Sequence, residues 1–278
     1  MTKSKRYLKK LVEHVLVVFF LLCLPACSPS KPKYTYNRKN IETSLVNICG
    51  KEFNVKPVVR EAGDTIWVYV PLNKILTEKK TFDNDANTKM RQIFTALKRV
   101  ILSMEKRPKF YAFVFSDIKT GADLYYIGTV LDIMKVDAGM ISLSEWQERE
   151  VFTFLLTTEA IGDVLGKHIT MPEMEMGNFL AYLIKQNLER KLTDKEMVKN
   201  FKTNDLYSYY ADGRLSVILD VTPVNKTAVS FNAGDEIKKS IRRFLKIYDA
   251  PEINSFEIND IAHKNAVFYS RKALLEGN

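Results

Sequence analysis

Two carboxylates have a spacing that could support acid–base chemistry. Glu159 and Asp163 are four residues apart in TTEAIGD, which would place both on one face of a helix. Paired carboxylates at a suitable separation can act as acid and base in the hydrolysis of sugars. Such pairs are also common on solvated surfaces, and Gly162 and Gly166 weaken a helix here. The sequence therefore favours a surface pair and leaves a glycan-cleaving site as the alternative.

The histidines lack the partners that metal or nucleophilic chemistry requires. His168 follows Gly166-Lys167 and His263 lies in IAHKN, and neither has a second ligand at HxxxH or CxxC spacing. The nucleophile-elbow pattern GxSxG is absent, and GDVLGKH has one residue too few between its glycines for a phosphate-binding loop. We expect both histidines on the surface or in loops, and we predict no metal and no cofactor.

An acidic segment resembles the start of a calcium loop without completing it. Residues 83–87 read DNDAN, but an EF-hand needs Gly at its sixth place and Glu at its twelfth, where this chain has Thr88 and Phe94. We expect the segment to cap the following helix, because Asp and Asn side chains accept hydrogen bonds from free helical amides.

The amino terminus has the three-part plan of an export signal. A basic start is followed by ten uninterrupted apolar residues, 15–24, and then by a small residue and a cysteine. A helix needs about 20 apolar residues to cross a bilayer, so this run suits insertion and cleavage better than permanent anchoring. The basic residues are Lys3, Lys5, Arg6, Lys9 and Lys10.

Residues 24–27, LPAC, resemble the lipobox of bacterial lipoprotein precursors, although Pro25 departs from the usual pattern. The resemblance implies cleavage between Ala26 and Cys27 by a lipoprotein signal peptidase, followed by acylation of Cys27. Two or more acyl chains, at about 0.8 kcal/mol per buried methylene, hold a protein on a bilayer. Two alternatives remain: an ordinary secretory signal, which would leave the Cys27 thiol unmodified, and an uncleaved membrane anchor over residues 11–24. No Asp follows the cysteine, which by analogy with enterobacterial lipoproteins favours an outer-membrane anchor facing the periplasm over the inner membrane.

The chain without its signal has the composition of an exported globular body. Removing residues 1–26 leaves 252 residues and a balance of 37 Lys and Arg against 32 Asp and Glu, so most of the apparent basicity belongs to the signal. Cys49 is the only cysteine left besides Cys27, which precludes an internal disulfide if Cys27 is acylated. Cys49 lies on a short apolar stripe and is expected in the core.

We predict four regions along the chain. Residues 1–26 form the signal peptide, and residues 27–40, with two prolines and no apolar periodicity, form a flexible tether. Residues 41–168 form a first α+β unit with a helical extension, and residues 169–278 form a second. In order of elements alone, each unit resembles the BON-type envelope domains, which implies interaction with the membrane or the envelope.

Each α+β unit is expected to contain a helix, a hairpin, a helix and a hairpin. The turns at Ala62-Gly63-Asp64 and Ala211-Asp212-Gly213 correspond at an offset of 150 residues between the glycines, and aligning Phe113 with Phe256 gives 143. We predict antiparallel sheets covered by helices. Capping boxes at Thr170/Glu173, Thr193/Glu196 and Ser142/Glu145 mark expected helix starts.

A basic helix supplies the one electrostatic feature of the body. The sequence EIKKSIRRFLKIY places five basic residues away from its apolar face, where they could bind anionic lipid or an acidic partner or could be solvated. They are Lys238, Lys239, Arg242, Arg243 and Lys246. An exported location disfavours nucleic acid as a partner.

No constellation specifies a reaction, and two classes of function remain. We prefer a lipid-anchored, non-enzymatic module that docks onto an envelope protein complex or the membrane. The alternatives are an enzyme acting on cell-wall or lipid substrates, through residues that converge in three dimensions, and a carrier of an apolar ligand. An exposed apolar patch or open sheet edge favours docking, and a buried cluster around Glu159, Asp163 and His168 favours the enzyme.

Overall fold

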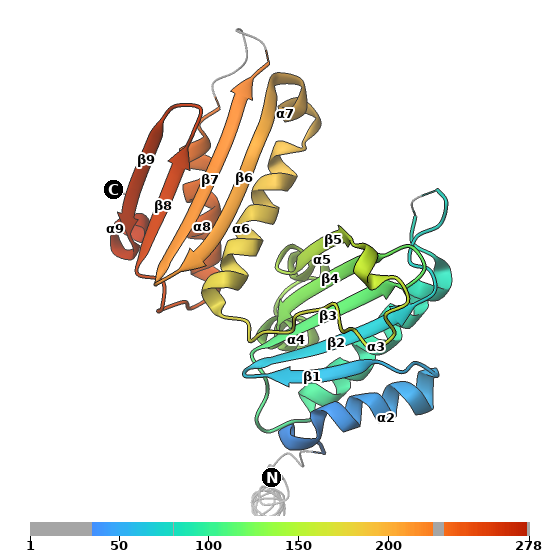
Figure 1. The fold of residues 1–278 in the computed structure, drawn as a ribbon. Helices are drawn as coiled ribbons and strands as arrows, with labels where there is room; N and C mark the ends of the chain where they lie inside the picture. The colour runs from blue at the N-terminus through green and yellow to red at the C-terminus, as the bar shows by residue number, and fades with distance from the viewer. Residues whose placement is uncertain (1–34, 80, 225–230, 277–278) are drawn as a thin grey trace, which may run out of the picture. The chain divides into compact units, whose positions relative to one another are not determined.

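The computed structural model describes residues 35–79, 81–224 and 231–276. The predicted signal peptide, the cleavage site between Ala26 and Cys27, and residues 27–34 of the predicted tether lie outside the described residues. Two mixed sheets, each covered by helices, form the described body, which confirms the α+β class (Figure 1).

The first sheet has five strands in the order β1-β2-β3-β4-β5. Helices α2 and α3 contribute residues to the apolar cluster on one of its faces, and Cys49 of α2 is fully buried there as predicted. The strands are β1 (Val58–Ala62), β2 (Thr65–Leu72), β3 (Phe110–Asp117), β4 (Ala122–Thr129) and β5 (Val151–Leu156). The helices are α2 (Ile41–Phe53), α3 (Asn84–Leu102), α4 (Val130–Asp137) and α5 (Leu143–Glu148), with short 3-10 turns η2 (Arg38–Asn40) and η3 (Thr158–Ala160).

The second sheet has four strands in the order β6-β7-β8-β9. Helices α6 and α8 pack against one face of it. The strands are β6 (Phe201–Ala211), β7 (Arg214–Pro223), β8 (Ser255–Asp260) and β9 (Asn265–Ser270). The helices are α6 (Met176–Leu192), α7 (Lys195–Asn200), α8 (Ala233–Ile247) and α9 (Arg271–Glu276).

Both sheets are mixed, which corrects the expectation of purely antiparallel sheets. The hairpins are antiparallel as predicted, but β2 pairs parallel with β3, and β7 pairs parallel with β8. The cause is the helix between the hairpins: α3 and α8 return the chain to the end at which the preceding strand began, so the next strand runs in the same direction.

The two sheets share details of their second hairpins at the predicted offset of 143 residues. Asp117 and Asp260 each end a strand, and each side chain accepts hydrogen bonds from amides two or three residues later. The residues four positions after them, Gly121 and Lys264, both have positive φ. A left-handed residue at the same place of a six-residue segment gives both hairpins the same turn.

The central parallel pair differs in length without changing which side chains face the helices. Pairing covers eight positions between β2 and β3, and six between β7 and β8. Successive side chains of a strand point to opposite faces, and in both sheets the apolar side chains of one face, such as Val68 and Leu215, lie in the core packed by the helices.

Sequence pattern explains why the first sheet is buried on two faces and the second on one. β2 (TIWVYVPL) and β3 (FYAFVFSD) are almost continuously apolar, and seven or more of the eight residues of each are buried. β7 and β8 alternate, with Ser216 and Glu257 among the residues opposite the helical face. Alternating strands suit a sheet with one solvated face.

Residues 157–175, which we call the strap, cover the second face of the first sheet. Figure 1 shows the strap leaving β5 and crossing the face opposite α2 and α3. The Trp67 indole donates to the Pro172 carbonyl at 2.8 Å, and the Met174 amide donates to the Thr65 hydroxyl at 2.8 Å. These bonds fix a segment that has almost no regular secondary structure of its own.

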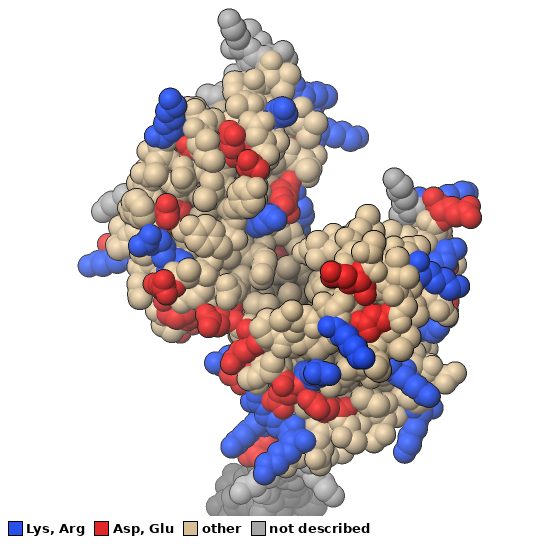
Figure 2. All heavy atoms as spheres, in the orientation of Figure 1, with Lys and Arg blue, Asp and Glu red and all other residues tan. Residues whose placement is uncertain are grey.

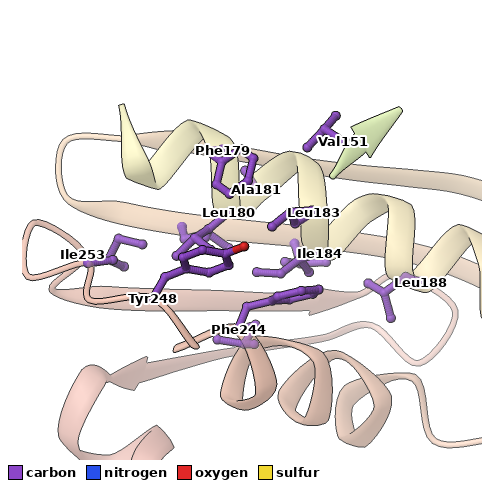
Figure 3. Packing of buried hydrophobic residues seen from close by; sticks show 14 of the residues in the cluster. Val151, Phe179, Leu180, Ala181, Leu183, Ile184, Leu188, Phe244, Tyr248 and Ile253 are labelled. Atoms are coloured by element: carbon purple, nitrogen blue, oxygen red, sulfur yellow. The ribbon is translucent and has the colours of Figure 1, made fainter. Parts of the chain in front are cut away.

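The strap leads into α6, whose apolar residues complete a core with both sheets. Phe179 packs against Phe110 of β3, with ring centroids 5.4 Å apart, and against Tyr248 at 5.6 Å. Figure 3 shows Val151 of β5 near the same set of side chains. Burial on α6 is therefore broad, which its position between elements of both sheets requires.

The predicted helix starts have mixed outcomes. Asp83 caps α3, accepting from the amides of residues 85 and 86, and Ser142 caps α5, both as expected. The Thr170/Glu173 capping box was wrong. Pro172 disfavours helical backbone at the residue before it, and Glu173 instead accepts from the Asp64 amide. The cap of α7 is Asp194, one residue after the predicted Thr193.

Candidate functional site

Strand β5 has more exposed large apolar side chains than any other strand among the described residues. Phe152, Phe154, Leu155 and Leu156 are 42%, 39%, 49% and 75% exposed, and only Val151 is buried. The sequence VFTFLL contains no charged residue. Exposed, uncharged apolar strands at a sheet edge are prone to association, so soluble proteins usually charge, shorten or cover them.

Backbone geometry shows which polar groups of β5 face away from the sheet. The Thr157 amide donates to the Gly121 carbonyl across the β4–β5 pair at 2.7 Å. Antiparallel pairing alternates, so residues 151, 153 and 155 also face β4, and residues 152, 154 and 156 present their N–H and C=O groups outward. The Phe152 amide confirms this, because it donates to Gln186 of α6 at 2.6 Å instead of to a strand.

The other sheet edges are protected differently. β1 is five residues long, contains Arg60 and Glu61, and has its Glu61 amide bonded to the Glu42 carboxylate of α2 at 2.7 Å. β6 carries Lys202 and Asp205 and an irregular register beside Asp205. β9 exposes only one large apolar side chain, Phe268. β5 alone has four exposed large apolar residues and no charge.

The strap adds further apolar surface next to the end of β5. Ile161, Val164 and Leu165 are 53%, 52% and 54% exposed. They line an open depression of about 540 Å³ together with Asp163 and His168. Figure 2 shows mainly uncharged atoms over the β5 end of the first sheet, whereas Lys and Arg gather at its α2 end. We call the exposed residues 152, 154–156, 161, 164 and 165 the apolar edge.

A buried ion cluster fastens the strap beneath this surface. His168 Nε2 lies 2.8 Å from an oxygen of Asp123 in β4, and Nδ1 lies 2.6 Å from Asp163. The Asp163 carboxylate also accepts the amides of Leu165 at 3.0 Å and His168 at 2.9 Å, while its backbone carbonyl accepts the Tyr69 hydroxyl. The side chains of His168 and Asp123 are 6% and 1% exposed. We call Asp123, Asp163 and His168 the clamp.

Electrostatic contacts within the clamp favour the charged forms of His168 and Asp163. Burial opposes the imidazolium, but hydrogen bonds to Asp163 and Asp123 outweigh burial and raise the pKa of His168. Burial likewise opposes the Asp163 carboxylate, yet the hydrogen bonds from the His168 ring and amide and the Leu165 amide lower its pKa to about 2. Both ring nitrogens are bonded to carboxylates, so the imidazole has no nitrogen left to accept a substrate proton.

The clamp corrects two expectations for this segment. His168 lies in a loop as predicted, but its side chain is buried. Glu159 and Asp163 do not share a helix, because the chain forms a single 3-10 turn at residues 158–160 and Gly162 follows with φ of +75°. Glu159 is exposed, whereas Asp163 turns inward to His168. The structure thus brings together Asp163 and His168 without Glu159, and adds Asp123.

A second buried polar group lies at the start of β5. The Tyr111 hydroxyl donates to Glu150, and both side chains are buried. Desolvation by burial raises the pKa of Glu150 to about 7, against the effect of the bond from Tyr111. Gly128 of β4 leaves room for this pair, since a Cβ there would lie 2.3 Å from the Tyr111 hydroxyl oxygen.

A further network ties α4 to the residue that follows α8. Asp132 accepts from Arg149 at 2.9 Å, from Thr129 at 2.7 Å and from the Tyr248 hydroxyl. Asp132 is 1% exposed. Three donors share this one buried carboxylate and satisfy its charge, which joins α4 to Arg149 and Tyr248.

The predicted basic residues lie on α8, and most are engaged within the chain. Lys238 bonds Asp235 at 2.9 Å and Lys239 bonds Glu236 at 2.6 Å. Arg242 donates to the Leu274 carbonyl at 2.6 Å, Arg243 pairs with Glu148, and Lys246 is exposed. Binding of an anion by these side chains would compete with the internal contacts.

Neither a scan against protein-family models nor a search of curated proteins finds a match to this chain. Within the described ranges, no helix has both the length and the apolar content needed to cross a bilayer. In that same part of the chain, no three His, Cys, Asp or Glu side chains are grouped as a metal site would require.

Proposed function

We propose that this chain is a lipid-anchored cell-envelope protein that docks another envelope protein through the apolar edge. The observation that carries the proposal is strand β5, which ends its sheet with four exposed large apolar side chains and no charge. A surface of this kind gains stability when a partner removes it from water, by about 25 cal/mol per Å² of apolar area buried.

The anchor rests on the resemblance at residues 24–27, which lie outside the described residues. Acylated Cys27 would place the body within reach of one membrane surface, because the residues between Cys27 and Tyr36 span at most about 30 Å when extended. An outer-membrane anchor facing the periplasm is the location we favour. Tethering raises the concentration of the apolar edge near membrane-bound partners and thereby helps a weak contact to form.

The clamp favours a structural role over the enzymatic alternative. A catalytic histidine needs one ring nitrogen that can exchange a proton with substrate. In this protein both nitrogens bond carboxylates, so neither is free to exchange a proton with a molecule in the depression beside them. The clamp therefore supports docking indirectly, because it holds Ile161, Val164 and Leu165 in place beside β5.

Site-specific photo-cross-linking in native cells tests the proposal. A photoreactive phenylalanine analogue replaces Leu156 in the full-length anchored chain, and a matched chain carries it at Tyr209, which is 48% exposed on β6. We expect a defined adduct with an envelope protein from position 156 and none from position 209. The same adduct should fall when Cys27→Ser releases the chain from membranes.

Two results would contradict the proposal. The first is the absence of any adduct from position 156 in abundant, folded protein, and the second is the same set of adducts from positions 156 and 209. Retention of Cys27→Ser in the membrane fraction after carbonate washing would separately defeat the lipid anchor.

A further inference from the structure

We infer that the partner contributes an extended, uncharged segment that pairs with β5 as the sixth strand of the first sheet. The inference rests on the proposed function and names the kind of partner that the apolar edge accepts. Its basis is the coincidence, at one place, of outward backbone groups and apolar side chains on both faces of the strand.

The open part of the edge is defined by the backbone. Residues 154 and 156 direct their N–H and C=O groups away from β4, as derived above from the β4–β5 pairing. Residue 152 is closed, because its amide is bonded to Gln186, which also donates to the Glu150 carbonyl at 2.8 Å. A partner strand can therefore pair along the Phe154–Leu156 half of β5, which includes Leu156, the most exposed side chain of the strand.

Side chains flank these groups on both faces of the strand. Phe154 and Leu156 lie on the face of Leu124 and Ala122, and Leu155 lies on the opposite face with Asp123, near the strap. A partner that covers both sets also removes water from the backbone between them. Buried N–H and C=O groups without partners are costly, so that partner must supply hydrogen bonds.

Only an extended polypeptide meets both requirements. Lipid can cover the side chains but cannot pair the backbone, and open sheet edges do not occur in the hydrocarbon region of a bilayer. A helix has already paired its own backbone groups, apart from its ends. A strand supplies alternating donors and acceptors at the spacing of β5 and continues both faces.

Charge defines the composition of the partner segment. Residues 151–158, VFTFLLTT, offer no charged group to pair with. A charged side chain directly opposite them would lose water without gaining a counter-ion. The expected segment is therefore uncharged over about four residues, with apolar side chains on both faces. Its assignment to another envelope protein rests on the proposed function.

A proline substitution separates backbone pairing from side-chain packing. Phe154→Pro removes an outward N–H that makes no bond within the sheet, and Phe154→Ala removes the same phenyl group while keeping that N–H. Both variants are made in the anchored chain with the photoreactive analogue at Leu155. Leu156→Pro and Leu156→Ala form a second pair at a site that is 75% exposed, where the fold is least affected.

We expect each proline variant to give at least about tenfold less adduct than its alanine counterpart, because the partner loses a hydrogen bond and leaves a buried acceptor unpaired. Thermal unfolding of each variant serves as the control that the body remains folded. Equal yields from proline and alanine variants would overturn strand addition and leave docking at the apolar edge intact. An adduct between two copies of this chain would overturn assignment of the strand to a different protein. Absence of adducts from the unsubstituted edge would refute the proposed function itself.

Discussion

Replacing Glu150 by Gln should stabilise the protein at alkaline pH and have little effect near pH 4. Burial raises the pKa of Glu150 from 4.5 to about 7, so ionising it is more costly in the folded protein than in the unfolded chain. That difference corresponds to about 3 kcal/mol. The glutamine oxygen can still accept the bond from Tyr111.

The pH window follows from the raised pKa. Below pH 4.5 the carboxyl is protonated in both states and causes no penalty. As the pH rises from 4.5 through 7, the unfolded chain ionises first, and the free energy of unfolding of the native protein falls. Above pH 7 the full difference of about 3 kcal/mol separates the native protein from Glu150→Gln.

Urea unfolding followed by tryptophan fluorescence measures this difference, because Trp67 of β2 and Trp146 of α5 both lie within residues 41–168, as Glu150 does. Unfolding free energies at pH 4.5, 6 and 8 are compared between the native protein and Glu150→Gln. Glu148→Gln serves as the control. It also removes one carboxylate, two residues before Glu150, but that carboxylate is exposed and paired with Arg243. Its effect should be small and of opposite sign, because the bond from Arg243 lowers the pKa of Glu148. Parallel pH curves for the native protein and Glu150→Gln would refute the buried, protonated carboxyl.

Two further substitutions test the clamp and the packing beneath the apolar edge. His168→Gln should lower the free energy of unfolding by about 3 kcal/mol at pH 5, because Asp123 is left buried without its cation. This loss should shrink as the pH rises through the raised pKa of His168. Urea unfolding at several pH values measures it, and a loss that does not change with pH would contradict a charged clamp. Gly128→Ala should lower the free energy of unfolding by about 2 kcal/mol at all pH values, because the new methyl group meets the Tyr111 hydroxyl, and an unchanged urea midpoint would show that Tyr111 can move aside.

Local signals made much of the fold predictable from sequence. Gly63 and Gly213 lie in the turns of the first hairpin of each sheet, both with positive φ. Asp83 caps α3, which has Asp85 in its first turn. These features depend on neighbours within a few residues. The parallel pairing of β2 with β3 required knowing the path of a whole crossover helix, and the sequence analysis assigned hairpins without that step.

The candidate site was harder to predict because its parts are distant in sequence. Asp123 and His168 are 45 residues apart, and no spacing rule joins them. Strand β5 was missed because it follows a short helix without a turn-forming dipeptide, although VFTFLL has the aromatic and branched composition of a strand. The uncharged character of that run was the available signal for an exposed edge.

Hydrogen exchange at the edge of β5 tests the central claim most directly. The anchored protein is exchanged in its native membranes and again after purification in detergent, and the amides of residues 154 and 156 are compared by fragmentation mass spectrometry. Docking by strand addition predicts slow exchange at both amides in membranes and fast exchange after purification, with no change along β6. Equal, fast exchange in both preparations would contradict occupation of the apolar edge in the envelope.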